Sequence, residues 1–359
     1  MSRPTPDARL DPYDYDLPEE RIARFPLERR DGGRLLVAQE DGWGERPIRD
    51  LAGVCRPGDL LVLNDSRVLP ARVVARRASG GLVEALLLAP TADHGPALVR
   101  PLRRLRPGEV LTPGRLTADG AFFPLDGASV RVGAREGDCV ALELSPSVGA
   151  VLEAVGEMPI PPYFKRRADA LDRERYQTVF AGPAGSVAAP TAGLHFTQGL
   201  LDNLRAQGVE VATLTLHVGA GTFLPLRPEQ IDRQELHLER YIIGEELAAA
   251  IQRTRARGGR VIAVGTTSTR ALESASDGAG GVRPGPGQTT LFIQEGFRFG
   301  VVDVLFTNLH LPRSSLLMLV CAFGGRARVM AGYAAALARG LRFYSYGDAM
   351  WVERARGEG

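Results

Sequence analysis

The sequence predicts an α/β (α+β) protein in which a barrel-like α/β core domain is interrupted by a small inserted antiparallel β-barrel domain. From about residue 70 to 148, short apolar or alternating runs are separated by Gly and Pro roughly every eight to twelve residues, which is typical of a small barrel or sandwich. On either side, strand-like runs alternate with amphipathic helical patterns, which indicates a largely parallel sheet or barrel. We therefore expect core residues at 1–64, the insertion at 65–148 and the rest of the core at 149–359.

Composition narrows the class of protein. The chain has 359 residues, of which 44% are hydrophobic and 24% charged, as expected for a globular protein with a sizeable core. It has no apolar run of membrane-spanning length and no signal-peptide pattern at its start, so we expect no membrane association and a cytoplasmic location. Its three cysteines are far apart and form no CxxC pair, which argues against a disulfide framework or a zinc site. With a net charge of only +2, no global basic field indicates nucleic acid.

Hydrophobic periodicity, together with Gly, Pro and capping residues, predicts where the helices and strands of the core domain begin and end. A helix is expected to begin near Leu17–Glu20, with Asp16 as its cap. The segment 274–288 is rich in Gly, Pro and Ser, which suggests a mobile loop or lid. The remaining expected elements are strands at 33–39, 58–66, 260–265, 289–297 and 301–312, and helices at 197–208, 244–259, 268–275, 314–324 and 326–340.

The stretch PTAGLHFT (190–197) places a histidine in a tight turn just before a helix. Pro190 and Gly193 constrain the backbone, and Thr197 is a natural N-cap. His195 therefore lies two residues before a helix N-terminus, where an anion or a developing negative charge is favoured. From the residues alone, two roles stay open for His195: a place in a functional site, or capping and packing between the domains.

Polar residues also follow the expected strands. Asn64, Asp65, Ser66 and Arg67 lie at a strand exit where two domains meet, which is either a turn at an interdomain corner or part of a cleft. Gly265 and four hydroxyl residues start a helix, which makes a cradle for a carboxylate or phosphate, with an arginine five residues on to pair it.

The histidine spacing does not indicate a metal site. His217, His237 and His310 lie on or at the ends of expected strands, without HxH, HxxxH or HExxH spacing. The run LTLHVGAGTFLPL (214–226) follows a strand, but it lacks a third glycine and Pro225 blocks the helix of a dinucleotide-binding loop. FYSYGDAMWV (343–352) is expected to end a strand with two tyrosines and an aspartate, which either stack on a base or close the core.

Two basic clusters suit phosphate recognition, because arginine forks bind phosphate oxygens bidentately. A solvated charged face is the alternative for each cluster. The residues concerned are Arg100, Arg103 and Arg104 in one cluster, and Lys165 and Arg166 in the other.

Taken together, these motifs resemble one family. LNDSRVLPAR, PTAGLHFT, LTLHVGAGTFLPL, VIAVGTTSTRALES, FTNLHLPRSSLLMLV and FYSYGDAMWV occur in the order found in the S-adenosylmethionine:tRNA ribosyltransferase-isomerases, from about residue 13 to 352. The resemblance implies an α/β core with an inserted β-barrel. It also implies transfer and rearrangement of the ribosyl unit of S-adenosylmethionine onto 7-aminomethyl-7-deazaguanine at the tRNA wobble position. The product would be epoxyqueuosine-tRNA, with adenine and methionine released and S-adenosylmethionine consumed as co-substrate rather than held as a cofactor.

That reaction needs a base beside the sulfonium, an acid for the departing adenine and stabilisation of an oxyanion, and histidine suits both proton tasks. We expect His195 and His310 to transfer protons, with Asp65 or Asp348 as orienter. Thr266, Thr267 and Arg270 would hold the methionine carboxylate. Further expected substrate contacts are Arg67, Thr191, Gly193, Phe196, His217, Asn308 and Tyr346, with Phe196, Tyr346 and Asp348 near the sulfonium.

Two other classes of protein remain as alternatives. An ordinary methyltransferase is disfavoured because the GxGxG loop is missing. A non-enzymatic RNA-binding protein built on the inserted barrel would retain tRNA but leave the strand-end histidines without a role. We expect a monomer.

Overall fold

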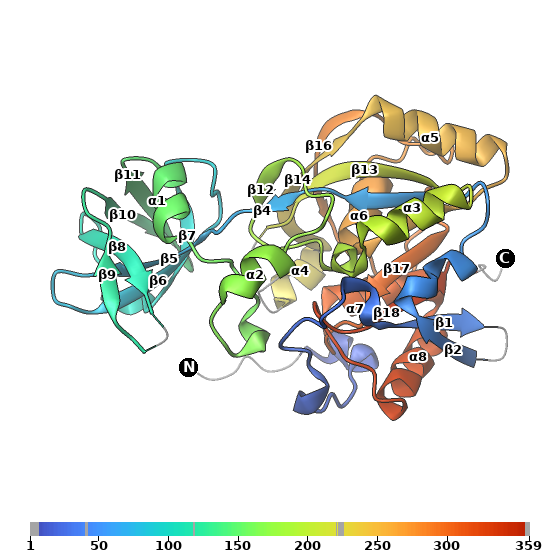
Figure 1. Cartoon of the computed structure of the whole chain (residues 1–359), viewed down its shortest axis with the longest axis horizontal. Helices are drawn as coiled ribbons and strands as arrows, with labels where there is room; N and C mark the ends of the chain where they lie inside the picture. The colour runs from blue at the N-terminus through green and yellow to red at the C-terminus, as the bar shows by residue number, and fades with distance from the viewer. Residues whose placement is uncertain (1–6, 40–41, 118, 220, 222–225, 356–359) are drawn as a thin grey trace.

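The computed structural model describes residues 7–39, 42–117, 119–219, 221 and 226–355, and Figure 1 shows a β-barrel set beside a larger sheet covered by helices. The expected fold class is confirmed. The larger sheet has nine strands in the order β16-β14-β13-β3-β15-β17-β18-β1-β2. Their bounds are β16 (Gly285–Leu291), β14 (Glu235–Ile243), β13 (Glu210–His217), β3 (Leu60–Asn64), β15 (Val261–Val264), β17 (Val304–Asn308), β18 (Ala349–Glu353), β1 (Arg34–Gln39) and β2 (Gly42–Pro47).

The centre of this sheet is parallel and its margins are antiparallel. Strands β13, β3, β15 and β17 run parallel to one another, and β18 and β1 form a second parallel pair. The pairs β16–β14, β14–β13, β17–β18 and β1–β2 are antiparallel. The carboxyl ends of the four central parallel strands therefore meet at one edge, where ligands bind in open α/β sheets.

Side-chain alternation along the central strands divides the core into two layers. In β3, Leu60 and Val62 belong to one hydrophobic cluster, whereas Leu61 and Leu63 belong to the other. Helices α5 (Glu245–Ala256), α6 (Gly265–Ser274), α7 (Ser315–Gly324) and α8 (Arg326–Ala338) contribute to the first layer. The second layer is completed by α3 (Gln198–Ala206) and the 3-10 segment η4 (Ile48–Gly53).

Pairing between β10 and β8 closes the sheet of the inserted domain into a barrel. Strands run in the order β10-β11-β7-β6-β5-β8, and β10 also pairs with β8. Alternate residues such as Val83 and Ala85 face a separate core, which α1 (Val148–Val155) covers. The bounds are β5 (Arg72–Arg76), β6 (Leu82–Leu87), β7 (His94–Arg100), β8 (Val110–Leu116), β9 (Phe122–Pro124, paired with β8), β10 (Ser129–Glu136) and β11 (Cys139–Ser145).

Short elements complete the two units and the junction between them. The two-stranded parallel sheet of β4 (Arg67–Val68) and β12 (Ala184–Ser186) lies at the junction. The others are α2 (Ala170–Arg175), α4 (Pro228–Arg233), η1 (Ala8–Tyr13), η2 (Glu19–Arg21), η3 (Arg30–Gly32), η5 (Leu102–Arg104), η6 (Pro162–Phe164) and η7 (Thr191–His195).

Three local expectations were wrong. Residues 17–20 do not begin an α-helix: Pro18 is extended and offers no capping side chain, so only the 3-10 turn η2 forms. The segment 274–288 is not a loose loop throughout, because Asp277 accepts hydrogen bonds from the amides of Ala279 and Gly281, and β16 begins at Gly285. The residues 344–348 precede β18 instead of ending a strand; they still reach the carboxyl edge of β17 because β18 is antiparallel to it.

No single helix among the described residues is long and apolar enough to span a membrane; α7 and α8 reach that length and composition only together, across a bend of 116°.

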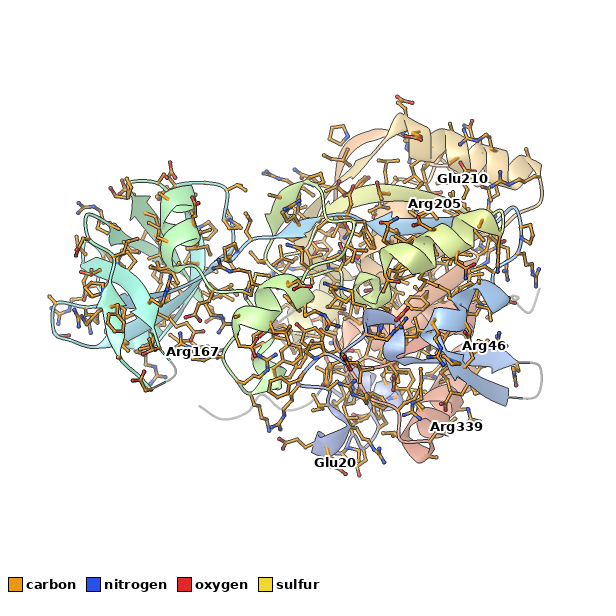
Figure 2. All side chains as sticks on the ribbon, in the orientation of Figure 1. Glu20, Arg46, Arg167, Arg205, Glu210 and Arg339 are labelled. Carbon is orange, nitrogen blue, oxygen red and sulfur yellow. The ribbon has the colours of Figure 1, made fainter. Side chains whose placement is uncertain are left out.

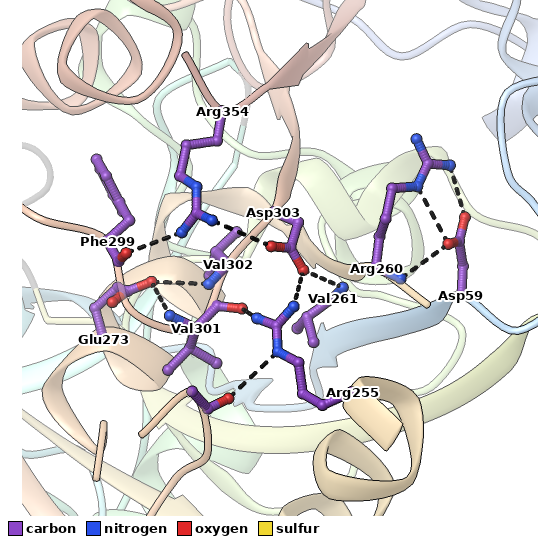
Figure 3. A network of polar contacts seen from close by, with 11 residues as sticks. Asp59, Arg255, Arg260, Val261, Glu273, Phe299, Val301, Val302, Asp303 and Arg354 are labelled. Carbon is purple, nitrogen blue, oxygen red and sulfur yellow. Dashed lines mark hydrogen bonds and ion pairs between the residues drawn. The ribbon is translucent and has the colours of Figure 1, made fainter. Parts of the chain in front are cut away.

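The amino ends of the parallel strands are fixed by carboxylates (Figure 3). Asp59, just before β3, accepts hydrogen bonds from the amides of Arg56 at 2.8 Å and Arg260 at 3.1 Å, and pairs with the Arg260 guanidinium at 2.7 Å. Asp303, just before β17, accepts from the amide of Val261 at 2.8 Å and pairs with Arg255. Each strand start is thus tied to its neighbour by a charged group, which sets the strand register.

Replacing Asp59 by alanine should lower the free energy of unfolding by about 3 kcal/mol, because the largely buried Arg260 loses its buried carboxylate partner and keeps only the half-exposed Glu353. Urea denaturation of the purified protein measures this change. Asp202→Ala is the matched control: its pair with Arg205 is exposed, so it should cost less than about 1 kcal/mol. Equal losses in the two variants would show that Asp59 does not anchor the sheet.

Candidate active site

A buried polar cluster lies at the carboxyl edge of the central strands. Charged side chains such as Arg167, Arg205 and Glu210 lie at the periphery (Figure 2), whereas this cluster is enclosed by β13, β3, β15, β17 and η7. Asn64 and Asn308 end β3 and β17 with side chains only 1% and 2% exposed. Amides buried to this degree must be fully hydrogen-bonded, so each one organises its surroundings.

Asn308 determines the state of His195. Its Nδ2 lies 3.0 Å from Nε2 of His195 and 3.1 Å from the carbonyl oxygen of Tyr344, and its Oδ1 accepts from the Thr191 hydroxyl at 3.3 Å. The two amide protons are therefore donated to the Tyr344 carbonyl and to Nε2 of His195. Because Nε2 accepts, the network assigns the imidazole proton to Nδ1.

Burial keeps this imidazole neutral. His195 is 5% exposed, and desolvation together with the nearby charge of Arg342 lowers its pKa to about 4. His195 lines a small hollow of about 20 Å³ that opens to solvent, and no described residue binds its Nδ1. A neutral imidazole with a free Nδ1–H is a hydrogen-bond donor and a weak acid at the wall of this hollow.

The roles within PTAGLHFT are thereby separated. Thr197 accepts a hydrogen bond from the amide of Leu200 at 3.1 Å and caps α3, so His195 is not needed as the cap. A side chain at Gly193 would come within 2.9 Å of Thr178 and Phe180, which explains the glycine. Phe196 is fully buried against Phe306, with ring centroids 5.4 Å apart. The expectation that Phe196 faces a substrate is corrected, since it belongs to the core.

His310 is held on the other face of β17. Its Nε2 lies 2.8 Å from the hydroxyl of Thr307, the strand neighbour of Asn308, and its amide donates to the Tyr333 hydroxyl at 2.8 Å. The hydroxyl of Tyr15 donates to its carbonyl oxygen. Burial lowers the pKa of His310 to about 3, so it too is neutral. The two histidines expected to share proton transfer thus lie in different layers, and only His195 borders the hollow.

A second polar group surrounds His217. Its Nδ1 lies 2.8 Å from the hydroxyl of Ser66, which is 2.6 Å from the hydroxyl of Ser186. Asp65 accepts from the Thr215 hydroxyl at 2.7 Å, and its charge opposes the burial that lowers the pKa of His217. Asp65 therefore acts electrostatically on His217. It makes no contact with His195 or His310, which corrects its expected role as their orienter.

The start of α6 lies between these two groups. Asn64 Nδ2 is 3.3 Å from the Thr267 hydroxyl, and Thr266 is 6% exposed in the first turn. Val264 provides no side-chain cap for this helix. Uncapped amides at a helix N-terminus favour an anion.

Arg270 is partly engaged by the protein itself. Its Nη1 pairs with Glu239, and its Nε donates to the carbonyl oxygen of Leu291 at 2.9 Å. Glu239 also accepts from the amide of Gly219 at 3.0 Å. Among the described residues, the buried Nη2 of Arg270 has no hydrogen-bond partner. Glu239 was not identified from the sequence, because its pairing with α6 depends on the sheet order.

The motif FYSYGDAMWV closes the core. Asp348 is 2% exposed, and its two oxygens accept from the amides of Arg34 at 2.8 Å and Arg342 at 2.7 Å. Tyr346 stacks on Phe164 and donates to Asp172. The core interpretation is therefore correct for Tyr346. Asp348 fixes the backbone at Arg34 and Arg342 and makes no hydrogen bond to His195 or His310, which corrects its expected role as their orienter. The side chain of Tyr344 stacks on Tyr163.

The basic residues expected to contact tRNA phosphates differ in whether their side chains are exposed and unpaired. Arg166 forms a bidentate pair with Asp172 at 2.5 and 2.8 Å and is largely buried, so it is corrected to a structural residue. Lys165 is exposed but paired with Glu19. Arg100 and Arg103 are exposed on the barrel, and the side chain of Arg104 lies outside the described residues.

The remaining sequence-based candidates are placed as follows. Arg67 donates to the carbonyl oxygens of Ala181 and Gly182 while staying exposed. His237 is exposed on β14. Ala220 and residues 222–225, including Pro225, lie outside the described residues. Within the described part of the chain, no group of three or more His, Cys, Asp or Glu side chains is arranged to hold a metal ion.

A polar site at the carboxyl edge of a parallel sheet, beside an inserted closed barrel, defines the architecture of an α/β enzyme. A sequence model described as "Queuosine biosynthesis protein" matches residues 10–352, and the chain belongs to this family.

Similar proteins support this assignment. Proteins named S-adenosylmethionine:tRNA ribosyltransferase-isomerase from Pelobacter propionicus and Acidithiobacillus ferrooxidans are each 50% identical, over 95% and 96% of this chain and 98% of their own length. A crystal structure of S-adenosylmethionine tRNA ribosyltransferase from Thermotoga maritima matches with a TM-score of 0.53 and 33% identity, covering 95% of this chain and 99% of that one. The chain is accordingly an enzyme, a transferase-isomerase.

The buried histidines predict a loss of stability in acid. An unfolded imidazole titrates near pH 6.5 and folded His195 near 4, so the unfolded state binds more protons between these values. Stability present above pH 6.5 is thus lost as the pH falls towards 4. His195→Gln removes this contribution. Below pH 6 the slope of the unfolding free energy against pH should therefore be smaller in the variant than in the wild type, by about 1.4 kcal/mol per pH unit.

Urea denaturation at pH 7, 6 and 5 checks this expectation, with His94→Gln on the exposed barrel strand β7 as the control. Identical pH profiles for wild type and His195→Gln would show that His195 is not held neutral by burial.

Proposed function

We propose that this enzyme transfers and isomerises the ribosyl moiety of S-adenosylmethionine onto 7-aminomethyl-7-deazaguanine at the wobble position of tRNA. The products are epoxyqueuosine-tRNA, adenine and methionine. The observation that carries the proposal is the neutral His195 with its free Nδ1–H at a hollow beside the strand-end cluster, in a chain of this family. S-adenosylmethionine is consumed as co-substrate without a further cofactor, by a monomer in the cytoplasm.

His195 is best suited to donate a hydrogen bond or a proton to the substrate. Its Nε2 lone pair is occupied by Asn308, so its available atom is the protonated Nδ1. A hydrogen bond from that proton assists departure of adenine through a ring nitrogen, or stabilises the oxyanion formed as the ribosyl ring rearranges. A neutral donor with a depressed pKa suits this task, because it gains strength as negative charge develops.

His217 is better placed as the base than His310. It is half-buried, Ser66 fixes its Nδ1, and the charge of Asp65 favours the protonated product of proton abstraction. The proton removed lies on the carbon beside the sulfonium, where positive charge makes it acidic. His310 instead orders the end of β17 through Thr307.

The first turn of α6 is proposed to hold the methionine carboxylate. The uncapped amides near Thr266 and Thr267 and the unpartnered Nη2 of Arg270 supply donors of the required kind. Exposed arginines of the barrel, Arg100 and Arg103, are proposed to contact tRNA phosphates together with Arg104 and Lys165.

The proposed reaction is tested by mass spectrometry of the wobble nucleoside after incubation with precursor tRNA and S-adenosylmethionine. A mass gain matching epoxyqueuosine with release of free adenine is the expected result. A methyltransferase would instead yield S-adenosylhomocysteine, and an RNA-binding protein would retain tRNA without any turnover. Either result would overturn the proposed function.

The role of His195 is tested by single-turnover adenine release. His195→Gln should lower the rate by about 10²-fold, the usual worth of a proton donor, with S-adenosylmethionine binding preserved. His94→Gln, on the surface of the barrel, is the control and should keep the wild-type rate. Near-normal adenine release by His195→Gln would exclude the donor role.

A further inference from the structure

Three arginines line the hollow at His195, and two of them, Arg30 and Arg175, form no salt bridge with a described residue, whereas Arg29 pairs with Asp31. Arg342 is not part of the lining, but it lies close enough to His195 for its charge to lower the pKa of that imidazole. Arg30 donates to the carbonyl oxygens of Glu174 at 2.9 Å and Arg175, Arg175 donates to that of Glu28, and Arg342 donates to that of Phe25. Within the described part of the chain, none of Arg30, Arg175 and Arg342 has a carboxylate within salt-bridge distance.

Several donors of these arginines are unused. Nε of Arg175 and Nη1 of Arg342 are buried, and no residue in the described part of the chain bonds to them. Burial lowers the pKa of both Arg30 and Arg342, and in each case a neighbouring arginine adds to the effect. Buried guanidinium donors without partners are costly, so their retention indicates a ligand that supplies the acceptors.

The neighbouring carboxylates are already used. Asp31 accepts from Arg29, and both oxygens of Asp348 accept backbone amides. The charges of Glu174 and Asp348 partly offset those of Arg30 and Arg342, but neither carboxylate forms a salt bridge with these arginines among the described residues. An oxyanion would supply the missing acceptors, because guanidinium groups bind carboxylate and phosphate oxygens through paired hydrogen bonds.

An exposed aromatic ring lies next to the mouth of the hollow. Phe25 is 54% exposed and Leu27 36%, and Pro26 and Leu27 line the hollow itself. The Arg166 guanidinium lies 4.3 Å from the Phe25 ring centroid, so this ring is supported on one side by a cation. Basic grooves flanked by exposed aromatic rings bind unpaired nucleotides through backbone phosphates and base stacking.

We propose that this hollow binds a backbone phosphodiester of the tRNA loop that carries the reacting base. Arg30 and Arg175 hold the phosphate oxygens, Arg342 adds positive charge nearby, and Phe25 provides a stacking surface for an adjacent base. The nucleotide is thereby placed beside His195. The identity of the RNA as tRNA rests on the proposed function. The exposed aromatic rim favours a nucleic acid over the methionine carboxylate, for which α6 and Arg270 offer a separate site.

The test measures tRNA and S-adenosylmethionine binding separately. Unmodified precursor tRNA is titrated by fluorescence anisotropy between 50 and 200 mM salt, and S-adenosylmethionine alone by calorimetry. Arg30→Gln and Arg175→Gln should each weaken tRNA binding by about 10-fold and reduce the slope of log K against log salt by about 1, as for one lost phosphate contact. Phe25→Ala should weaken tRNA binding without changing the slope, because stacking releases no counterions.

Control variants separate recognition from folding. Arg283→Gln removes an exposed arginine just before β16, at the opposite edge of the sheet, and should change neither affinity nor slope. Arg30→Lys keeps the charge but not the fork, so it should retain the salt slope while losing part of the affinity. Thermal unfolding of each variant identifies any loss of tRNA affinity that is caused by misfolding. If Arg30→Gln does not fold, the tRNA affinities of Arg175→Gln and Phe25→Ala decide the question.

Two results would overturn the inference: unchanged tRNA affinity and salt slope in both arginine variants, or a loss confined to S-adenosylmethionine binding, which would make the occupant a carboxylate. These results are distinct from failure of the proposed function. A wild type that binds tRNA through Arg30 but releases no adenine would refute the reaction and leave the phosphate site standing. Normal adenine release by Arg30→Gln with unchanged tRNA binding would refute the phosphate site and leave the proposed reaction standing.

Discussion

The hydrogen bonds of the Asn308 side chain are the interaction on which the site depends. One buried amide joins three segments that are distant in the sequence: η7 through Thr191 and His195, the end of β17, and the backbone at Tyr344. The amide has two protons and both are committed, so the imidazole can only accept at Nε2. The protonation state of His195 is thus set by a neutral neighbour rather than by a carboxylate, and burial preserves it across the physiological pH range.

Opposite edges of the same sheet serve opposite purposes. At the amino edge, Asp59 and Asp303 meet arginines and strand amides, and these charges are compensated within the protein. At the carboxyl edge, Arg175 and Arg342 keep buried donors without partners, and Arg270 keeps one as well. The charges of the amino edge are therefore compensated within the protein, whereas the carboxyl edge keeps donors that no described residue satisfies. This asymmetry is expected where a rigid sheet supports a binding site at one end.

Much of the architecture could be predicted because it depends on residue patterns within short stretches of sequence. Alternation with Gly and Pro punctuation indicated the barrel, and apolar runs followed by polar residues indicated strand ends, as at Asn64. Errors arose where local signals are weak. Pro18 and two glutamates suggested a helix, but without a capping side chain only a 3-10 turn forms. Phe196 and Tyr346 lie within motifs rich in polar residues, yet their rings are buried, and burial is not visible in a motif.

The sequence by itself determined the inserted barrel, the alternation of strands and helices, and the positions of the polar motifs along the chain, because these depend on periodicity over a few residues. Only the tertiary structure decided which motifs meet. The strand order puts Asn308 beside His195 and Asp65 beside His217, and it places His310 on the far face of β17. It also brings Arg30 and Arg175, from two distant segments, to the hollow at His195. Such groupings arise from long-range packing, which no short stretch of sequence encodes.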